Sequence, residues 1–209
     1  HYADIGHVAP ELLADKGMIV SVESKAIDGQ DTPRVQARIL SYLNLAKLAE
    51  AEGATWLDKE LLKRQPERIV AQGFGAQVNG ALVQRRKWLI ENSLGTETEQ
   101  GLFKPSPNLL QRLRQRDLRQ ASVALSKELG LTYAEPTEGQ EIAGRYSRST
   151  HLASGKYAVI QKAKEFVLVP WQREFEYTKG KPITGTVSGQ TITWGWGSER
   201  RKGIGGLAI

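Results

Sequence analysis

The spacing of apolar residues changes near residue 135, and this change constrains the fold more than any other feature of the chain. Before it, apolar residues recur at three- and four-residue intervals, as at Leu109, Leu110 and Leu113, which places them on one face of a helix. After it, apolar and polar residues alternate in short segments between glycines, a pattern typical of strands. The sequence therefore predicts an α+β chain with a largely helical first half and a β-rich C-terminal part.

Three segments follow from this pattern. Residues 1–40 are expected to form a short β segment, residues 41–132 a helical domain, and residues 133–209 a small basic β-barrel domain. The boundary between the two larger segments is placed at about residues 132–141, where a proline and a glycine lie among acidic residues. A chain of 209 residues is long enough for one large domain or two small ones.

Local signals place the elements of the first two segments. The strands expected in residues 1–40 are Tyr2–Ile5, Met18–Val22 and Arg34–Leu40, with a helix from Pro33 as the alternative for the last. The helices expected next are one capped by Asn44 and ended by Gly53, one started by a Thr55–Asp58 capping box, one over 76–92, and one from Ser106-Pro107 to Gly130. A hairpin is expected over 95–105.

A helix followed by a hairpin resembles a winged helix. In that interpretation the helix over 76–92 reads a DNA groove and exposes Gln84 and the basic run Arg85–Lys87. Two observations oppose it: the expected wing carries Glu97 and Glu99, which would repel phosphate, and an amphipathic helix is more often simply solvated. The winged helix is therefore one of two interpretations of this half.

The C-terminal part predicts five strands and one short helix. The strands are Ile142–Ser147, Lys156–Gln161, Phe166–Val169, Ile183–Ser188 and Thr191–Trp194, and the helix covers about 171–178. Many short strands with glycine-rich turns suggest a small antiparallel barrel that is closed or partly closed. The order of the elements matches an OB-type barrel, and an SH3-like barrel is the alternative.

The positive charge of the chain is concentrated in its last third. The net charge is +6 overall, but residues 144–209 hold 11 Lys and Arg against 4 Asp and Glu, a net charge of +7. A compact basic module favours polyanions, chiefly nucleic acid, although solubility alone is the competing explanation. The same region contains several Tyr and Trp residues, whose rings can stack on unpaired bases.

Candidate nucleic-acid-binding residues come from exposed basic runs and from a tryptophan pair on one strand face. They are Arg85, Arg86, Lys87, Arg112, Arg116, Arg145, Arg148, Trp194, Trp196, Arg200, Arg201 and Lys202. For the helical arginines a charged, solvated surface is the competing explanation, and for the aromatic residues it is a place in the barrel core.

The sequence lacks the residue types or motifs that several classes of functional site require. The chain has no cysteine, and its three histidines do not have metal-ligand spacing, so we expect neither a metal site nor a cofactor. No nucleophile motif or phosphate-binding loop occurs. No apolar run reaches the roughly 18–20 residues that cross a bilayer. These observations predict a chain without catalysis or membrane insertion, in a reducing cytoplasm.

A set of short stretches, taken in order, resembles a known family. They are His1–Gly6, Ala54–Leu61, Gly73–Gly75, Arg85–Ile90, Gly144–Tyr146, Leu152–Ile160, Phe166–Trp171 and Lys202–Gly205. Together they resemble the C-terminal region of conjugative relaxases of the TraI-like class, the mobilisation nucleases, in a region of unknown function. The resemblance covers nearly the whole chain.

The resemblance implies a bacterial parent protein that processes plasmid DNA. In such relaxases an N-terminal domain nicks the transfer origin with a tyrosine, beside a histidine cluster that holds a metal; neither motif occurs here. We therefore expect a non-catalytic accessory region that binds or positions single-stranded or transfer-origin DNA during mobilisation. The alternative is a protein-interaction module that docks the relaxase to relaxosome or type IV secretion proteins.

Overall fold

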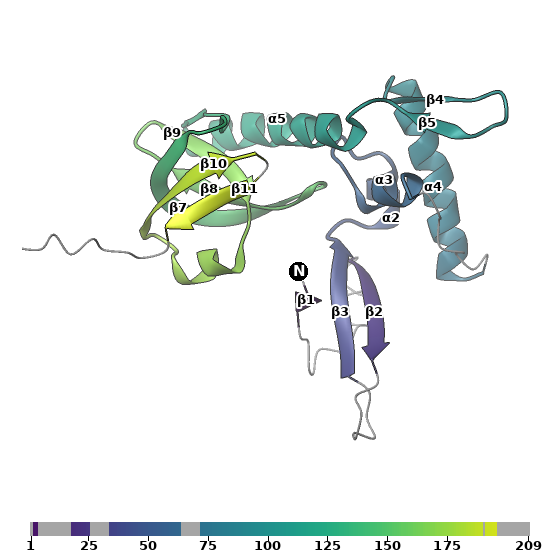
Figure 1. The fold of residues 1–209 in the computed structure, drawn as a ribbon, viewed down its shortest axis with the longest axis horizontal. Helices are drawn as coiled ribbons and strands as arrows, with labels where there is room; N and C mark the ends of the chain where they lie inside the picture. The colour runs from purple at the N-terminus through teal and green to yellow at the C-terminus, as the bar shows by residue number, and fades with distance from the viewer. Residues whose placement is uncertain (1, 4–17, 26–33, 64–71, 190, 196–209) are drawn as a thin grey trace, which may run out of the picture. The chain divides into compact units, whose positions relative to one another are not determined.

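The structure is a computed structural model that describes residues 2–3, 18–25, 34–63, 72–189 and 191–195 (Figure 1). It is a mixed α+β fold, as the change of period predicts. Its contacts divide the chain into two compact units. Unit 1 comprises residues 1–121 and 151–155, and unit 2 comprises residues 122–150 and 156–209. The division falls inside the long helix α5, so each unit is described by itself.

Unit 1 begins with a three-stranded antiparallel sheet. Its strands are β1 (Tyr2–Ala3), β2 (Ile19–Lys25) and β3 (Arg34–Ser41), in the order β1-β3-β2. The strand expected at Arg34–Leu40 is confirmed, so the alternative helix from Pro33 is wrong for the residues from Arg34 on. Period-two alternation in this stretch therefore outweighs the helix-start signal of a proline.

Helices α2 (Leu45–Ala49) and α3 (Trp56–Leu61) of unit 1 begin where their capping residues predict. Helix α4 (Phe74–Glu91) begins two residues before the expected start at 76, and the long helix α5 (Leu109–Leu129) follows it. The Asn44 side chain accepts a hydrogen bond from the Lys47 amide at 3.0 Å, and Thr55 and Asp58 form the expected capping box. Helix α2 ends before Gly53, which instead lies in a buried loop.

The start of α5 differs from the prediction. Ser106 does not cap it; its amide donates to the Leu94 carbonyl, and its hydroxyl accepts from Arg112. The helix begins at Leu109, after Asn108 turns the chain with φ 56°. The expected hairpin is present between α4 and α5 as β4 (Gly95–Glu97) paired with β5 (Phe103–Pro105).

Unit 2 is built on one six-stranded sheet. Its strands are β6 (Thr132–Tyr133), β7 (Glu141–Leu152), β8 (Gly155–Gln161), β9 (Glu165–Pro170), β10 (Pro182–Ser188) and β11 (Thr191–Gly195), and the 3-10 helix η1 (Arg173–Tyr177) joins β9 to β10. The five predicted strands and the short helix are confirmed. Strand β6, which was not predicted, pairs parallel with β9, so the sheet is mixed rather than antiparallel.

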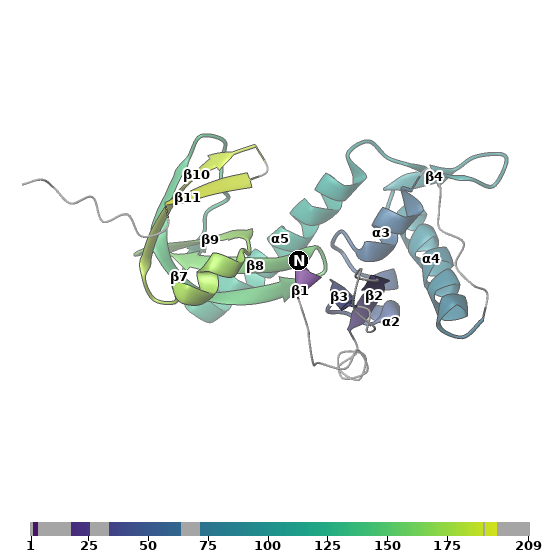
Figure 2. The same cartoon turned by 60° about the horizontal axis from the view of Figure 1, so that its bottom comes forward.

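The strand order is β11-β10-β7-β8-β9-β6, and the described pairings leave β11 and β6 as edges. The sequence predicts a barrel that is closed or partly closed, and the described strands show no closed barrel. The sheet is nevertheless strongly curved (Figure 2), and residues from β7 to β11 pack with Phe175 of η1 in one core. Buried residues also occupy the other face of β8 and β9, as at Val159 and Leu168, which gives these two strands continuous apolar runs.

Candidate nucleic-acid interface

A row of cations lies along one end of the unit 2 sheet. Arg145 of β7 is the register partner of Pro182, so Lys181 lies next to it at the start of β10. On the other side, Gly144 packs against the end of β8, where a Cβ on this glycine would lie 2.6 Å from the Gln161 carbonyl oxygen. Lys162 and Lys164 follow in the tight turn between β8 and β9. We call Arg145, Lys162, Lys164 and Lys181 the basic row.

The basic row presents its charge to solvent. Arg145, Lys164 and Lys181 are exposed and Lys162 is partly exposed. None of the four forms an ion pair with another residue that the structure describes. Glu165 is the acidic residue within this end of the sheet. Since neighbouring strands lie about 4.8 Å apart, a row across four strands spans about 14 Å, the scale of a few nucleotides.

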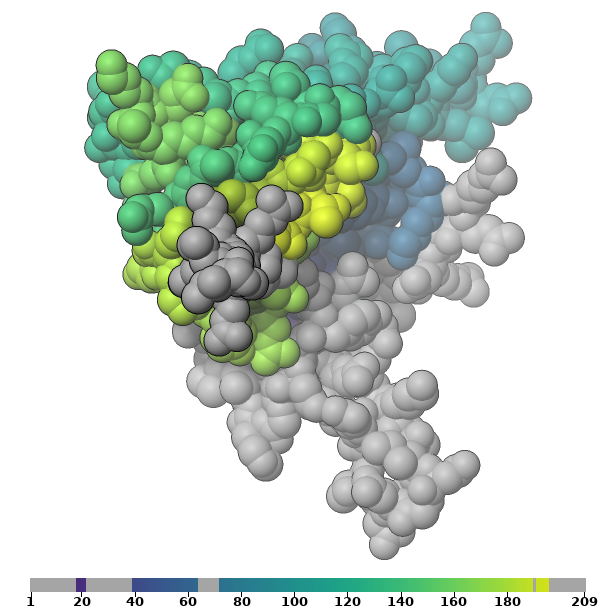
Figure 3. Space-filling view, turned by 60° about the vertical axis from the view of Figure 1, so that its left-hand side comes forward, coloured from purple at the N-terminus to yellow at the C-terminus, as the bar shows by residue number. Residues whose placement is uncertain are grey.

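A rigid turn next to the basic row adds an exposed aromatic ring. Lys181 donates its amide hydrogen to the Thr178 carbonyl at 2.9 Å, and Gly180 lies between them with φ 74°. The Gly180 amide donates to the Tyr146 carbonyl at 2.8 Å, and Nη1 of Arg145 donates to the Gly180 carbonyl at 2.9 Å. We call residues 177–181 the Tyr177 turn. Strands β10 and β11, which follow it, form part of the surface seen in Figure 3.

The two arginines predicted on β7 have different surroundings. Arg145 belongs to the basic row, and its bond to Gly180 uses one of its five guanidinium N–H donors. Arg148 forms an ion pair with Glu128 of α5, in which Nη2 donates to both carboxylate oxygens at 2.6 and 2.7 Å. The charge of Arg148 is therefore locally neutralised, although the pair is about half exposed.

The basic run of α4 does not form one exposed surface. Arg85 is fully buried, so the prediction that it is exposed is wrong. Its position on α4 faces the core of unit 1, where its side chain forms an ion pair with Asp58. Arg86 donates to the Gly101 carbonyl and pairs with Glu97 at 2.6 Å. Lys87 is exposed, 3.8 Å from Glu91.

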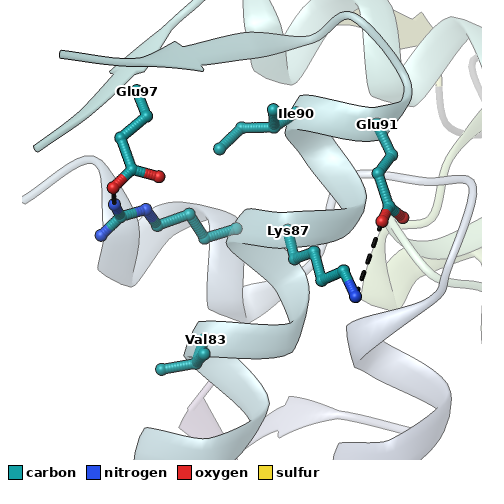
Figure 4. Close-up of a pocket in the computed structure, with 6 residues that line it drawn as sticks. Val83, Lys87, Ile90, Glu91 and Glu97 are labelled. Atoms are coloured by element: carbon teal, nitrogen blue, oxygen red, sulfur yellow. Dashed lines mark ion pairs between the residues drawn. The ribbon is translucent and has the colours of Figure 1, made fainter. Parts of the chain in front are cut away.

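A shallow groove of about 490 Å³ lies on the outer face of α4 (Figure 4). Val83 and Ile90 supply its apolar part (Figure 4). Arg86 of the helix forms an ion pair with Glu97 of the hairpin. Val83 is 70% exposed. The rim carries two cations and two anions, and so has no net charge to attract a polyanion.

The arginines predicted on α5 lie in unit 1. Arg112 is exposed and donates to the Ser106 hydroxyl at 3.0 Å. Arg116 is partly exposed and lies 3.7 Å from Glu52. Their role in binding stays a prediction, but neither belongs to the basic row.

The tryptophan prediction is wrong for Trp194. Its side chain is 8% exposed and packs edge-on against Phe175, with ring centroids 5.2 Å apart. A buried ring cannot stack on a base, and alternation on β11 explains the burial because Trp194 faces the core. Trp196, Arg200, Arg201 and Lys202 lie outside the described residues.

Sequence reasoning missed Lys162, Lys164, Lys179 and Lys181, because each is an isolated lysine in a turn rather than part of a basic run. The signal that could have found them is positional: turns that follow consecutive strands of one sheet meet at its ends. In the sequence, Tyr177 is one of several aromatic residues of the C-terminal region. Its exposure of 67% depends on the last turn of η1, which no local pattern fixes.

At the opposite end of β8 and β9 from the basic row, an aromatic contact involves a lysine whose pKa is shifted. Nζ of Lys156 lies 3.4 Å from the ring centroid of Trp171. Burial lowers the pKa of Lys156, and the carboxylate of Glu176 opposes that effect. Lys156 thus contributes to the packing of Trp171 as well as to the charge of unit 2.

The model of a family described as a protein of unknown function (DUF3363) matches residues 18–205. The chain belongs to this family. Neither a curated protein nor a solved structure matches the chain. The family description names no activity.

Two further features concern metal binding and membrane insertion in the described part of this DUF3363 chain. There, no group of three or more His, Asp or Glu residues is arranged to hold a metal ion. Among the same residues, no helix combines the length and apolar character that a bilayer span requires.

Proposed function

We propose that this chain is a non-catalytic accessory region of a bacterial plasmid-mobilisation relaxase, which binds or positions DNA during transfer. The resemblance of its ordered motifs to the C-terminal region of conjugative relaxases supports the proposal that the parent protein is a relaxase. The basic row supports DNA as the ligand, and it is the single observation that carries the proposal. In this proposal the chain acts in the bacterial cytoplasm and travels with its parent and the DNA.

The physical argument is the release of counterions. A DNA strand carries condensed cations, and each Lys or Arg that neutralises a phosphate releases some of them to solution. A lysine or arginine without an acidic partner can contact a phosphate without first breaking an ion pair. Arg148 and Arg86 are each paired with a carboxylate, and each would have to break that ion pair before it could bind a phosphate. The basic row therefore supplies more binding free energy per charge than the paired arginines.

A winged-helix mode has less support. Arg85 of the expected reading helix is buried, and Arg86 is paired with Glu97 on the expected wing. In our proposal the contact surface is the end of the unit 2 sheet instead.

Fluorescence anisotropy with labelled single-stranded and duplex oligonucleotides, at two salt concentrations, tests this function. The fourfold variant Arg145→Ala/Lys162→Ala/Lys164→Ala/Lys181→Ala should weaken binding and reduce the slope of log K against log salt by about 3, from roughly 0.7 per phosphate contact on a single strand. The matched control is Lys47→Ala/Lys59→Ala/Lys104→Ala/Lys127→Ala, which removes equal charge from other exposed positions. If both variants lose the same amount of DNA affinity, binding depends on total charge and not on the basic row. If the wild-type chain does not bind DNA at low salt, the proposal is overturned.

A second candidate function is a protein-interaction module that docks the relaxase to relaxosome or type IV secretion proteins. The observation that favours it is the groove on α4, with Val83 and Leu102 of the nearby hairpin each more than half exposed. In that case Val83→Asp should reduce co-purification of such partners and leave DNA affinity unchanged, whereas the fourfold variant of the basic row should do the reverse.

A further inference from the structure

We propose that the Tyr177 turn makes this interface selective for single-stranded DNA, with one unpaired base stacked on the ring of Tyr177. The proposal rests on the proposed function, because it names the form of DNA that the same end of unit 2 recognises. It is carried by the placement of an exposed ring beside cations on a rigid turn.

The ring is exposed by the way η1 is anchored. Phe175 is fully buried in the unit 2 core, where its ring lies 5.0 Å from that of Tyr146. Two residues later, the chain has turned so that Tyr177 is 67% exposed. A large aromatic ring held out of the core next to a fully buried one leaves apolar surface in water. A base that covers this ring removes that surface from water.

The turn is held in one conformation before any ligand binds. Both the amide and the hydroxyl of Thr178 donate to the Phe175 carbonyl at 3.2 Å. The Gly180 amide and carbonyl are bonded to β7, through Tyr146 and Arg145. A ligand that binds here does not have to order the backbone, which reduces the entropy lost on binding.

The charges around the ring favour a phosphate backbone. Lys179 and Lys181 are exposed on either side of Gly180, and Arg145 lies over the turn. Arg173 adds a fourth cation at the start of η1. Glu174 and Glu176 oppose them on the same helix, which leaves two positive charges in excess. A strand whose base stacks on Tyr177 would place its adjoining phosphates among these lysines.

The geometry distinguishes single strands from duplex DNA. In a duplex each base face is already stacked on its neighbours, and exposing one requires unstacking and unpairing. In a single strand a face is available without that loss, and stacking on an aromatic side chain is sequence-tolerant. The Tyr177 ring should therefore contribute to single-strand binding and contribute nothing to duplex binding.

The test is anisotropy of the whole chain with an oligothymidine and with a hairpin duplex of equal length. Tyr177→Ala should weaken binding of the single strand about tenfold, since one stacked base is worth roughly 1–3 kcal/mol, and change duplex binding less than twofold. Tyr177→Phe should keep single-strand affinity, because stacking needs the ring and not the hydroxyl. Tyr42→Ala, which removes a partly exposed tyrosine of unit 1, should change neither.

The outcomes separate this inference from the function on which it rests. If the wild-type chain binds neither oligonucleotide at low salt, the proposed function fails. If it binds both and Tyr177→Ala leaves single-strand affinity unchanged, or lowers both affinities equally, the single-strand inference is overturned while DNA binding stands. A loss in Tyr177→Phe equal to that in Tyr177→Ala would also overturn the stacking role.

Discussion

Arg85 and Asp58 form an ion pair in which neither side chain is exposed to solvent, with Nε of the arginine 2.8 Å from Oδ1 of the aspartate. Nη2 of Arg85 donates to Oδ2 of Asp58 and to the Gly53 carbonyl, and Nη1 donates to the Ala51 carbonyl. Oδ2 of Asp58 also accepts from the amide and the hydroxyl of Thr55. A residue of the predicted DNA-reading run is thus the polar centre of unit 1, where it joins α3, α4 and the loop before α3.

Removing Arg85 should destabilise unit 1 strongly. Arg85→Ala leaves the carboxylate of Asp58 buried without its partner, which typically reduces the free energy of unfolding by about 3–5 kcal/mol. Urea unfolding followed by circular dichroism measures the change. The control is Arg86→Ala on the same helix, which breaks a partly exposed pair and should cost less than about 1 kcal/mol. Similar effects for the two variants would contradict a structural role for Arg85.

Substitution by alanine should change stability in opposite directions at two glycines, Gly144 and Gly80. A Cβ at Gly144 would lie 2.6 Å from a backbone carbonyl of β8, so Gly144→Ala should destabilise unit 2 by about 1–3 kcal/mol. Gly80 in α4 has no atom within 4 Å of such a Cβ. Gly80→Ala should therefore stabilise unit 1 by about 0.5–1 kcal/mol through helix propensity. Differential scanning calorimetry distinguishes the two signs.

Replacing Trp194 should act on folding rather than on a binding surface. Trp194→Ala removes a ring from the unit 2 core and should lower the free energy of unfolding by about 3–5 kcal/mol. Trp194→Phe keeps most of the volume and should retain DNA affinity in anisotropy titrations. If a Trp194→Phe protein is folded by circular dichroism and has nevertheless lost DNA affinity, Trp194 would belong to the binding surface after all.

Releasing Arg148 should strengthen DNA binding. Glu128→Gln removes the carboxylate that holds the Arg148 guanidinium and adds one free cation to unit 2. Affinity at low salt should rise, and the slope of log K against log salt should steepen by roughly 0.7 for a single strand. Arg148→Ala should have a smaller effect than removal of any basic-row cation. An affinity unchanged by Glu128→Gln would place Arg148 away from the DNA.

Alkaline pH should destabilise unit 2 through Tyr133. Burial, with smaller contributions from Glu135 and Tyr157, raises the pKa of Tyr133 from 10.0 to about 12. The fold therefore favours the neutral phenol, and this contribution to stability is complete below about pH 10 and is lost as the pH rises towards 12. Tyr133→Phe should flatten the loss of stability between these pH values, as measured by urea unfolding. An unchanged pH dependence in Tyr133→Phe would assign the alkaline loss to other groups.

Much of the secondary structure was predictable because it depends on neighbours in the sequence. The caps at Asn44 and Thr55, the alternation in β7, β10 and β11, and the apolar runs of β8 and β9 are read within a few residues. The errors also have local causes. Ser106-Pro107 has the composition of a helix start, but Ser106 is bonded to Leu94, so α5 begins later. Strand β6 has two residues and no detectable period.

The sequence indicates which region contains the candidate interface, but not which residues form it. The charge excess of residues 144–209 correctly indicates where exposed cations gather, and Arg145 was named. Which lysines stand beside it depends on strand order, and Lys181 and Lys162 reach Arg145 from opposite sides through β10 and β8. Sequence spacing cannot show this, because the partners lie tens of residues apart.

The sequence by itself determined the class of the fold, the positions of most elements and the third of the chain that carries the positive charge. The tertiary structure decided which charged and aromatic residues are available to a ligand. Arg85 and Trp194 are buried because long-range packing places them against Asp58 and Phe175, while Tyr177 is exposed because Phe175 anchors the helix before it. Local pattern sets the backbone, but burial depends on contacts between residues far apart in the sequence, and burial decides which residues can bind.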